Sequence, residues 1–432
     1  MSLTYARRLS WPRDALPVPV VTVGSVMSLA LLGDSLLYVA LPAHAAELAL
    51  PLWSVGVLLG ANRIIRLVTN GLAARLFNRV GSRIPMVGAC VGSVVSTAMY
   101  GLVPAFLPFL VARMVWGTCF SILRLGAFTV VMAASRPSTR GRLVGMYQSI
   151  SRMGSVASLL LGSLIVEMLG YHTAFVILGI ATAPAILLAL LLPERAYHAA
   201  PVTVPAPGPA GRTAPPASPA TPAVAATPRM SWRERWLGSP RLVAVKLGML
   251  VNGFTSQGVV LATLTLALAE VTGTAEGTAA LGGLLVACRW ASDLFLAPGF
   301  GHLSDRIGRG RMIPALLALE AVAVLGLSMS TNRTTVIVAT LAVFLTSTAM
   351  SAASDAAAGD LAPPDRRAEV MSGYSDWIDI GAALGPPLAF VLADRLGLFP
   401  SYGCTAILLV GVAVWFTITW RRERISPSGQ PI

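Results

Sequence analysis

Twelve apolar runs, each long enough to cross a lipid bilayer as a helix, constrain the fold of this chain more than any other feature. A spanning helix needs about 20 predominantly apolar residues. Only 12% of the 432 residues are charged, whereas a soluble protein of this size carries about a quarter. The sequence therefore predicts an all-α integral membrane protein. Its spans are expected at residues 18–42, 51–74, 84–104, 106–133, 143–168, 172–192, 241–269, 277–299, 312–330, 334–357, 370–393 and 399–420.

Basic residues are distributed unequally between the two sides of the predicted membrane. With the N-terminus in the cytoplasm, 23 basic residues fall in cytoplasmic segments and only Arg333 and Arg395 fall on the opposite side. Positively charged loops remain on the cytoplasmic side during insertion. We therefore expect a multi-pass protein of the cytoplasmic (inner) membrane with both termini in the cytoplasm. The same distribution explains the net charge of +13 without a nucleic-acid partner.

A segment rich in proline and alanine divides the chain. Nine prolines lie among the 28 residues from Pro201 to Pro228, a composition that cannot form a packed core. The sequence thus predicts an N-terminal six-helix bundle over 1–192, a cytoplasmic linker over 193–240 and a C-terminal six-helix bundle over 241–432. Near the end of the linker, residues 231–236 combine Trp and Arg with capping-box spacing. They fit an interfacial helix or a continuation of the linker equally well.

The two halves repeat the same landmarks at an offset of 227 positions. Six spans in each half give both bundles the same topology, so an axis along the membrane normal should relate them as a pseudo-symmetric pair. In membrane proteins, such halves bracket a transport pathway. Matches include Leu76, Arg79 and Gly81 with Leu303, Arg306 and Gly308, then Gly154 with Gly381, and Leu169-Gly170 with Leu396-Gly397.

The loop after the eighth span resembles the cytoplasmic-loop signature of the major facilitator superfamily. It reads Gly301-His-Leu-Ser-Asp305-Arg306-Ile-Gly308-Arg309, and the N-terminal copy reads Asn78-Arg79-Val-Gly81. The resemblance implies a twelve-helix transporter in which these loops gate the cytoplasmic side. Asn78 replaces the expected aspartate, so the N-terminal copy can cap a helix but brings no negative charge to an inter-bundle lock.

Two further segments resemble family motifs of proton-coupled members. Arg113-Met-Val-Trp-Gly117 resembles the Arg-x-x-x-Gly motif of the fourth span, whose arginine is implicated in substrate or proton coupling. Asp34 stands where the family places an acidic residue in the first span. A carboxyl group in apolar surroundings suits proton uptake and release, and a static pair with an arginine of the same half is the alternative. Asp34 and Arg113 are our proton-coupling candidates.

Other ionisable side chains lie at mid-span, where each costs roughly 2.5–3.5 kcal/mol on insertion scales. Arg289 and Asp293 are four residues apart, a spacing that favours a structural ion pair over a ligand contact. For Glu320, lipid-facing and bundle-facing positions remain open. Candidates for lining a substrate cavity are Arg63, Arg66, Arg124, Arg152, Lys246, Arg289, Asp293 and Asp379, with the aromatic residues Tyr38, Tyr147, Tyr374 and Trp377.

Glycine and proline set the eleventh span apart from the fifth. Drug–proton antiporters of the family carry Gly-Pro in the fifth span, where this chain has Ser158-Leu159. The eleventh span instead contains Gly385-Pro386-Pro387, which should kink or open that helix near the bundle interface. The departure in the fifth span weakens a multidrug-antiporter interpretation.

The predicted function is secondary active transport of a small organic solute by alternating access, coupled to protons. Arginine forks bind carboxylate and phosphate, so the excess of intramembrane arginine favours an anionic or zwitterionic solute. The alternatives are a multidrug or metabolite efflux pump of the same fold, and a non-transporting membrane scaffold or sensor. No nucleophile–base pair, metal cluster or phosphate loop indicates an enzyme, a metal or another cofactor. The expected partners are the solute, protons and lipid, and we expect a monomer.

Overall fold

Helices account for the secondary structure throughout the part of the chain that the computed structural model describes. That part comprises residues 18–103, 105–135, 139–192, 234, 236–363 and 367–422. The first half contains α1 (Val18–Ala30), α2 (Leu32–Ala43), α3 (Leu52–Val80), α4 (Arg83–Leu102), α5 (Phe106–Ala134), α6 (Arg140–Ala157), the π-helix η1 (Ser158–Gly162), α7 (Ser163–Leu169), α8 (Tyr171–Thr182) and α9 (Pro184–Leu190).

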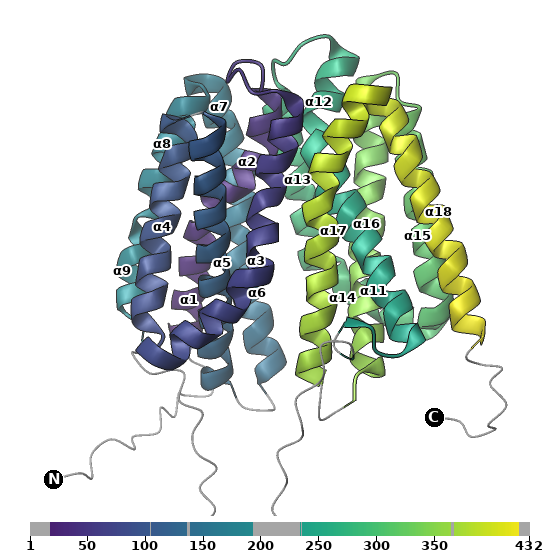
Figure 1. Cartoon of the computed structure of the whole chain (residues 1–432), viewed down its shortest axis with the longest axis horizontal. Helices are drawn as coiled ribbons and strands as arrows, with labels where there is room; N and C mark the ends of the chain where they lie inside the picture. The colour runs from purple at the N-terminus through teal and green to yellow at the C-terminus, as the bar shows by residue number, and fades with distance from the viewer. Residues whose placement is uncertain are drawn as a thin grey trace, which may run out of the picture.

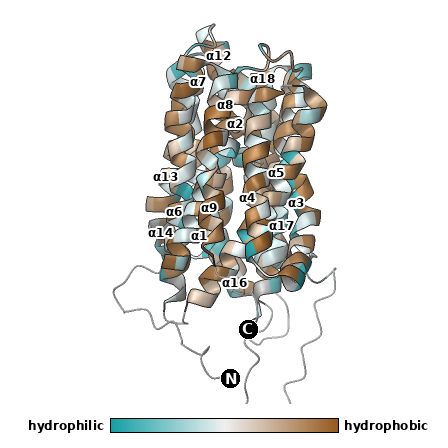
Figure 2. Cartoon of the chain, turned by 90° about the vertical axis from the view of Figure 1, so that its left-hand side faces the viewer, coloured by the Kyte–Doolittle hydropathy of each residue, from teal (hydrophilic) through white to brown (hydrophobic). Residues whose placement is uncertain are grey.

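The second half has the same succession of long helices. It contains α11 (Pro240–Asn252), the π-helix η2 (Gly253–Val260), α12 (Leu261–Thr272), α13 (Thr278–Phe295), α14 (Ala297–Ile307), α15 (Arg309–Ser328), α16 (Arg333–Leu361), α17 (Arg367–Leu396) and α18 (Leu398–Arg422). Figure 1 shows α1–α9 gathered on one side of the molecule and α11–α18 on the other. In the side view of Figure 2, hydrophobic residues follow the facing helices over most of their length, as lipid contact requires.

The predicted spans agree with the helices, with one difference in the eighth. Among the described residues, eleven helical stretches are long and apolar enough to cross a membrane, and α13 with α14 makes a twelfth if that bent pair is one span. The bend is 61°, where the sequence predicts one run over 277–299. Pro298, in the first turn of α14, has no backbone N–H to continue the hydrogen-bond ladder of α13. The linker, apart from its last residues, lies outside the described part, so its predicted boundaries stay predictions.

Glycines of the sequence repeat have matching backbone conformations in the two halves. Gly81 and Gly308 end α3 and α14 with φ of 81° and 86°. Gly170 and Gly397 precede α8 and α18 with φ of 81° and 90°. Glycine adopts this region without the steric cost that a Cβ brings. The repeat thus fixes equivalent turns in each bundle.

A second glycine pair lets equivalent helices approach closely. A Cβ on Gly154 of α6 would overlap the Ser28 carbonyl group of α1, and a Cβ on Gly381 of α17 would overlap the Leu250 carbonyl oxygen of α11. The first and fifth spans therefore cross as the seventh and eleventh do, and the predicted pseudo-symmetry is visible in the packing.

One set of contacts between the two halves lies toward the end of the molecule away from the termini (Figure 1). There α2 packs against α12, and α13 packs against η1 and α7. Glu167 of α7 also accepts a hydrogen bond of 2.9 Å from the backbone N–H of Ala280, in the first turn of α13. The carboxylate lies at the positive end of that helix, so it holds the halves together at this end.

The longest contact between the halves runs along α3 and α17. A Cβ on Gly60 would overlap the Ala383 carbonyl oxygen, and one on Gly56 would overlap the Pro386 carbonyl oxygen. Helix α17 continues through Pro386 and Pro387 as one helix, so these prolines do not break it. A bend there stays a prediction. Gly385 crosses Gly258 of η2 on another side of the same helix.

Candidate functional site

Asp34 and Arg113 form a buried ion pair inside the first half. Asp34 lies in the first turn of α2, just after α1 ends, and its Oδ1 is 2.5 Å from Nη1 of Arg113 on α5. The Arg113 side chain is fully buried and the Asp34 side chain is 13% exposed. Nε of Arg113 also donates to the Leu58 carbonyl oxygen at 2.9 Å, and Nη2 to that of Leu59 at 3.4 Å. The guanidinium thus links the first, second and fourth spans.

Asn62 completes this cluster and was not among the residues singled out from the sequence. Its Nδ2 donates to Oδ1 of Asp34 at 3.2 Å, and its Oδ1 accepts from the Tyr38 hydroxyl at 3.5 Å. The Arg113 guanidinium lies 5.6 Å from the Tyr38 ring centre and 5.9 Å from that of Tyr100. The available signal was an amide side chain at mid-span, one turn from both Leu58 and Arg66.

Asp379 lies among three arginines of the other half. Its carboxylate is 3.6 Å from Nη1 of Arg63, 3.9 Å from Nη1 of Arg66 and 3.8 Å from Nη1 of Arg124. Arg63 and Arg66 are on α3, Arg124 is on α5, and Asp379 is on α17, so the cluster crosses the boundary between the bundles. The sequence placed each residue in the membrane interior, but only the fold brings these four together.

Aromatic and backbone contacts hold the arginines of this cluster. Nε of Arg66 donates to the Asn62 carbonyl oxygen at 3.0 Å, and its guanidinium lies 4.4 Å from the Phe120 ring centre. Arg124 approaches the same ring at 5.8 Å. One carboxylate against three guanidinium groups leaves the cluster with an excess of positive charge.

A second cross-bundle contact is built around Trp290 of α13. The guanidinium of Arg152, on α6, lies 3.8 Å from the Trp290 ring centre. Arg289 of α13 lies 4.9 Å from that ring and 5.5 Å from Phe344 of α16. All three distances are in the range of cation–π attraction. The Arg152 position in the fifth span therefore contacts the eighth span, whereas the repeat-equivalent Asp379 contacts the second and fourth.

The ion pair expected from the four-residue spacing of Arg289 and Asp293 does not form. No ion pair joins these two described residues within 4.0 Å, and Oδ1 of Asp293 accepts the Thr348 hydroxyl of α16 at 2.6 Å. Nε and Nη1 of Arg289 are buried with no hydrogen-bond partner among the described residues. The guanidinium lies against the Trp290 and Phe344 rings instead, so the ion pair expected from the spacing was wrong here.

Four further candidates also make contacts with residues outside these clusters. Tyr147 is buried and packs edge-on against Phe128, and the Tyr374 hydroxyl donates to Asp355 at 2.7 Å. Near the start of α11, the buried Lys246 donates to the Trp236 carbonyl oxygen at 3.3 Å, and the Trp377 ring contacts that of Trp236. Their lining of a cavity remains a prediction.

The C-terminal signature loop is held within its own half. Arg309 pairs with Asp305 at 3.0 Å and with Asp360, and donates to the Ala356 carbonyl oxygen at 2.6 Å. These partners tie the start of α15 to the end of α16. Gly308 forms the turn, while Arg306 and, in the other half, Arg79 are exposed. The Asn78 side chain lies outside the described residues, so the gating role of Gly301 and its neighbours stays a prediction.

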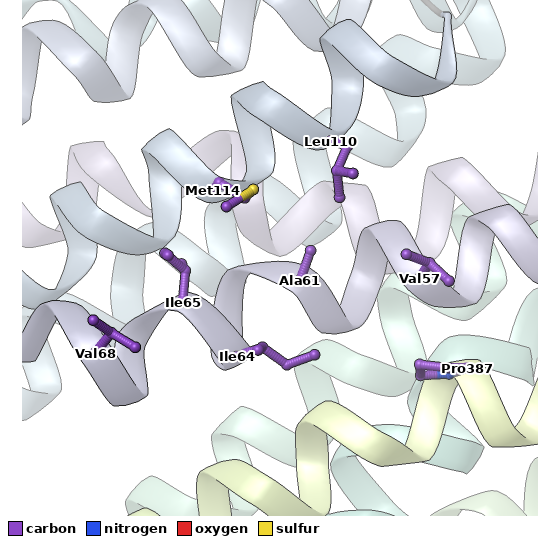
Figure 3. A pocket seen from close by; sticks show the side chains of 8 residues that line it. All are labelled: Val57, Ala61, Ile64, Ile65, Val68, Leu110, Met114 and Pro387. Carbon is purple, nitrogen blue, oxygen red and sulfur yellow. The ribbon is translucent and has the colours of Figure 1, made fainter.

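An apolar groove of about 310 Å³ lies along α3 and α5 and reaches α17 of the second half. It is lined by Val57, Ala61, Ile64, Ile65, Val68, Leu110, Met114 and Pro387, as Figure 3 shows. Ile64 and Val68 are 51% and 63% exposed. The groove follows a face of α3 that excludes Asn62 and Arg66. We interpret it as a surface for lipid tails rather than as the solute site.

Two like bundles of membrane-spanning helices, with ionisable side chains where they meet, define a polytopic membrane protein of the transporter class. The chain belongs to the Major Facilitator Superfamily, whose family model matches residues 23–266 and 245–431. Fold and family together support a secondary transporter of small solutes, a class of protein that is not enzymatic.

Solved transporters share the fold at low sequence identity. A bacterial homologue of the human lysosomal transporter Spinster, in an inward-facing and occupied conformation, aligns with a TM-score of 0.76 at 16% identity over 95% of this chain and 98% of that one. The nucleoside transporter NupG aligns with a TM-score of 0.72 at 11% identity over 94% of this chain and 100% of that one.

Sequence similarity to a curated transporter is partial. The synaptic vesicular amine transporter of Homo sapiens is 29% identical over 147 residues, which are 33% of this chain and 28% of that protein. The matched stretch thus spans less than a third of that relative's length.

Proposed function

We propose that this protein carries a small organic anion or zwitterion across the membrane by alternating access, coupled to protons. The observation that carries the proposal is the charge at the boundary between the bundles. Five arginines of three helices in one half and one helix in the other gather there, with two aspartates. The group comprises Arg63, Arg66, Arg124, Arg152 and Arg289 with Asp379 and Asp293.

Guanidinium groups in a low-dielectric site favour planar oxyanions. Arg presents parallel N–H donors that match a carboxylate or phosphate, and Arg289 has two buried N–H groups without a protein acceptor in the described structure. A solute anion between the halves would satisfy these donors. Arg152 contacts Trp290 of the second half, and Asp379 contacts arginines of the first half. An anion bound to these arginines would compete with the contacts between the halves and so change the ratio of open to closed molecules.

Proton coupling is assigned to the Asp34–Arg113 pair. Protonation of Asp34 would remove the charge that holds Nη1 of Arg113, leaving the guanidinium attached to the Leu58 and Leu59 carbonyl oxygens of α3. The link between the first and second spans would then be weakened, while the Tyr38 hydroxyl still donates to the Leu59 carbonyl oxygen and to Asn62. Since α3 also carries Arg63 and Arg66, the proton and solute sites share one helix.

The test is transport by purified protein in proteoliposomes, preceded by a thermal-shift screen of monocarboxylates, dicarboxylates, phosphate esters and amines of matched size. Stabilisation by the anions and accumulation driven by an imposed pH gradient are expected. Asp34→Asn should abolish that accumulation while solute exchange continues. Stabilisation by amines alone, or gradient-driven accumulation by Asp34→Asn, would overturn the corresponding part of the proposal.

Amine export is the second candidate, favoured by the partial similarity to a vesicular amine transporter. A cationic amine requires an accessible carboxylate. Asp34 is already paired with Arg113, and Asp379 is surrounded by arginines, so neither presents a free negative charge. The amine arm of the thermal-shift screen decides between the two candidates.

A further inference from the structure

Glu320 of α15 is a buried carboxyl group that the proposed mechanism has not used. Its side chain is fully buried, and neither carboxyl oxygen has a hydrogen-bond partner among the described residues. It forms no ion pair there. Isolated carboxylates in apolar surroundings take up a proton rather than remain charged, since burying the bare charge costs far more. The sequence left its orientation open, and the fold places it inside the C-terminal half.

The helices packed against Glu320 carry few charged side chains in their middle parts. Helix α15 packs against α16 and α18, and at its ends against α11 and α14. Between Arg333 and Asp355, α16 has no acidic or basic side chain. On α18, the Tyr402 hydroxyl is bonded to Thr263, and Cys404 is exposed.

Two charged groups on the other neighbouring helices are engaged elsewhere. Lys246 of α11 bonds to Trp236, and Asp305 of the α14 end pairs with Arg309. Arg289 of α13 is the group whose charge acts on Glu320. Arg289 also interacts electrostatically with Asp293 and with Arg152, which contacts Trp290 across the boundary between the bundles.

We propose that Glu320 is a second proton-binding residue and that it shares Arg289 with the transported anion. When the anion takes the two unpartnered N–H groups of Arg289, Glu320 holds a proton. When the anion leaves, the guanidinium turns to Glu320, which releases that proton and becomes a paired carboxylate. Each anion bound is thus accompanied by one proton taken up from solution, and each anion released returns it.

The sharing of Arg289 between Glu320 and the anion rests on the proposed anion transport. It predicts that the anion and the proton cross the membrane in the same direction. The anion and the proton bind together, so they move together, and the positive charge of Arg289 is balanced in both states. The separated arrangement seen in the structure, with both groups buried and unpaired, is the one that an anion on Arg289 would stabilise. Asp34 remains the proton site of the N-terminal half.

At mildly acidic pH, above the usual pKa of an exposed glutamate and before the pair with Arg289 forms, infrared spectroscopy of the full-length protein in detergent tests the proton on Glu320 without any solute. We expect the wild type to show a carboxylic acid C=O band that is absent from Glu320→Gln and unchanged in Glu276→Gln, a control at an exposed glutamate. Gln mimics the protonated side chain, so this variant should fold. Identical bands in the wild type and Glu320→Gln would overturn the proposal.

The coupling to Arg289 has its own readout. In Arg289→Gln the Glu320 carboxyl group loses the guanidinium that would stabilise its ionised form. The carboxylic acid C=O band of Glu320 should therefore persist at pH values where the wild-type band has faded. Equal fading in the two proteins would refute the sharing of Arg289. In proteoliposomes, Glu320→Gln should retain solute exchange and lose at least tenfold in gradient-driven accumulation. Should the wild type transport no anion at all, the proposed function fails, and the infrared measurements still decide the assignment of Glu320.

Discussion

Asp379 of α17 faces Arg63 of α3 at 3.6 Å across the boundary between the two halves. Arg66 and Arg124 complete the arginines around the same carboxylate, which is therefore the only acidic group in that cluster. Each of these ion pairs must loosen if α3 and α17 separate. The cluster thus connects the charge of the proposed solute site to the contact that the proposed alternating access has to change.

Replacing Asp379 by Asn should destabilise the protein, because three guanidinium groups would lose their shared counterion. Removal of one partner from a buried pair costs about 3–5 kcal/mol, and the distances here place the expected loss near the lower limit. Thermal unfolding in detergent measures it. Asp394→Asn, an exposed position on the same helix, should be neutral. An Asp379→Asn protein as stable as that control would show that the cluster does not hold the halves together.

Arg113→Lys should inactivate transport although the charge is kept. The guanidinium bonds in three directions, to Asp34, to the Leu58 carbonyl oxygen and to that of Leu59. An ammonium group has no planar fork and cannot reproduce this set. We expect the transport rate to fall at least tenfold, with an unfolding temperature lowered by a few degrees. Wild-type rates in the Lys variant would mean that charge alone is required at this position.

The fold could be predicted from the sequence because its signals are local. Apolar length locates the spans, and the repeated glycines Gly81 and Gly308 mark equivalent turns whose φ values agree. The repeat even predicts equivalent contacts. Phe128 contacts Tyr147 in the first half, and Asp355 contacts Tyr374 in the second. The residues of the second contact lie 227 positions after those of the first. The first contact is between two aromatic rings and the second is a hydrogen bond. The repeat therefore places equivalent residues together, although the side chains and their interactions differ.

Partners within the site could not be predicted in the same way. Which side chains meet between two helices depends on how each helix is rotated and how far it is shifted, and spacing along one helix carries no such information. Arg289 was therefore assigned to Asp293 on its own helix. In the structure its guanidinium lies 5.5 Å from the Phe344 ring of α16 instead. The pairing of Asp34 specifically with Arg113, and the role of Asn62, likewise became visible only once α2, α3 and α5 were assembled.

Gly60→Ala should weaken the contact between the halves. A methyl group there would overlap the Ala383 carbonyl oxygen, and backbone atoms cannot yield as a side chain would. Overpacking of this kind costs about 1–3 kcal/mol. Gly71→Ala is the matched control on α3, because nothing lies near its added Cβ, and it should stabilise the helix slightly. Unfolding temperatures of both variants, together with transport rates, test the difference. Two variants that behave alike would contradict close packing at Gly60.

Glu167→Ala should favour opening at the end of the molecule where α7 meets α13. The carboxylate accepts the Ala280 N–H across the bundle boundary, and it interacts with the positive end of α13. Losing about 1 kcal/mol there corresponds to roughly a fivefold change in the ratio of open to closed molecules. Glu167→Gln keeps an acceptor oxygen and should give a smaller shift.

Spin labels at Met168 and Thr274, both exposed near this contact, report the opening as an interlabel distance. The background must lack Cys288 and Cys404, which are exposed thiols. The long-distance population should grow in the order wild type, Glu167→Gln, Glu167→Ala. Because the acceptor is lost only in the Ala variant and the charge in both, this order separates the hydrogen bond from the helix-dipole attraction. Superimposable distance distributions for all three proteins would show that Glu167 caps α13 without holding this end closed.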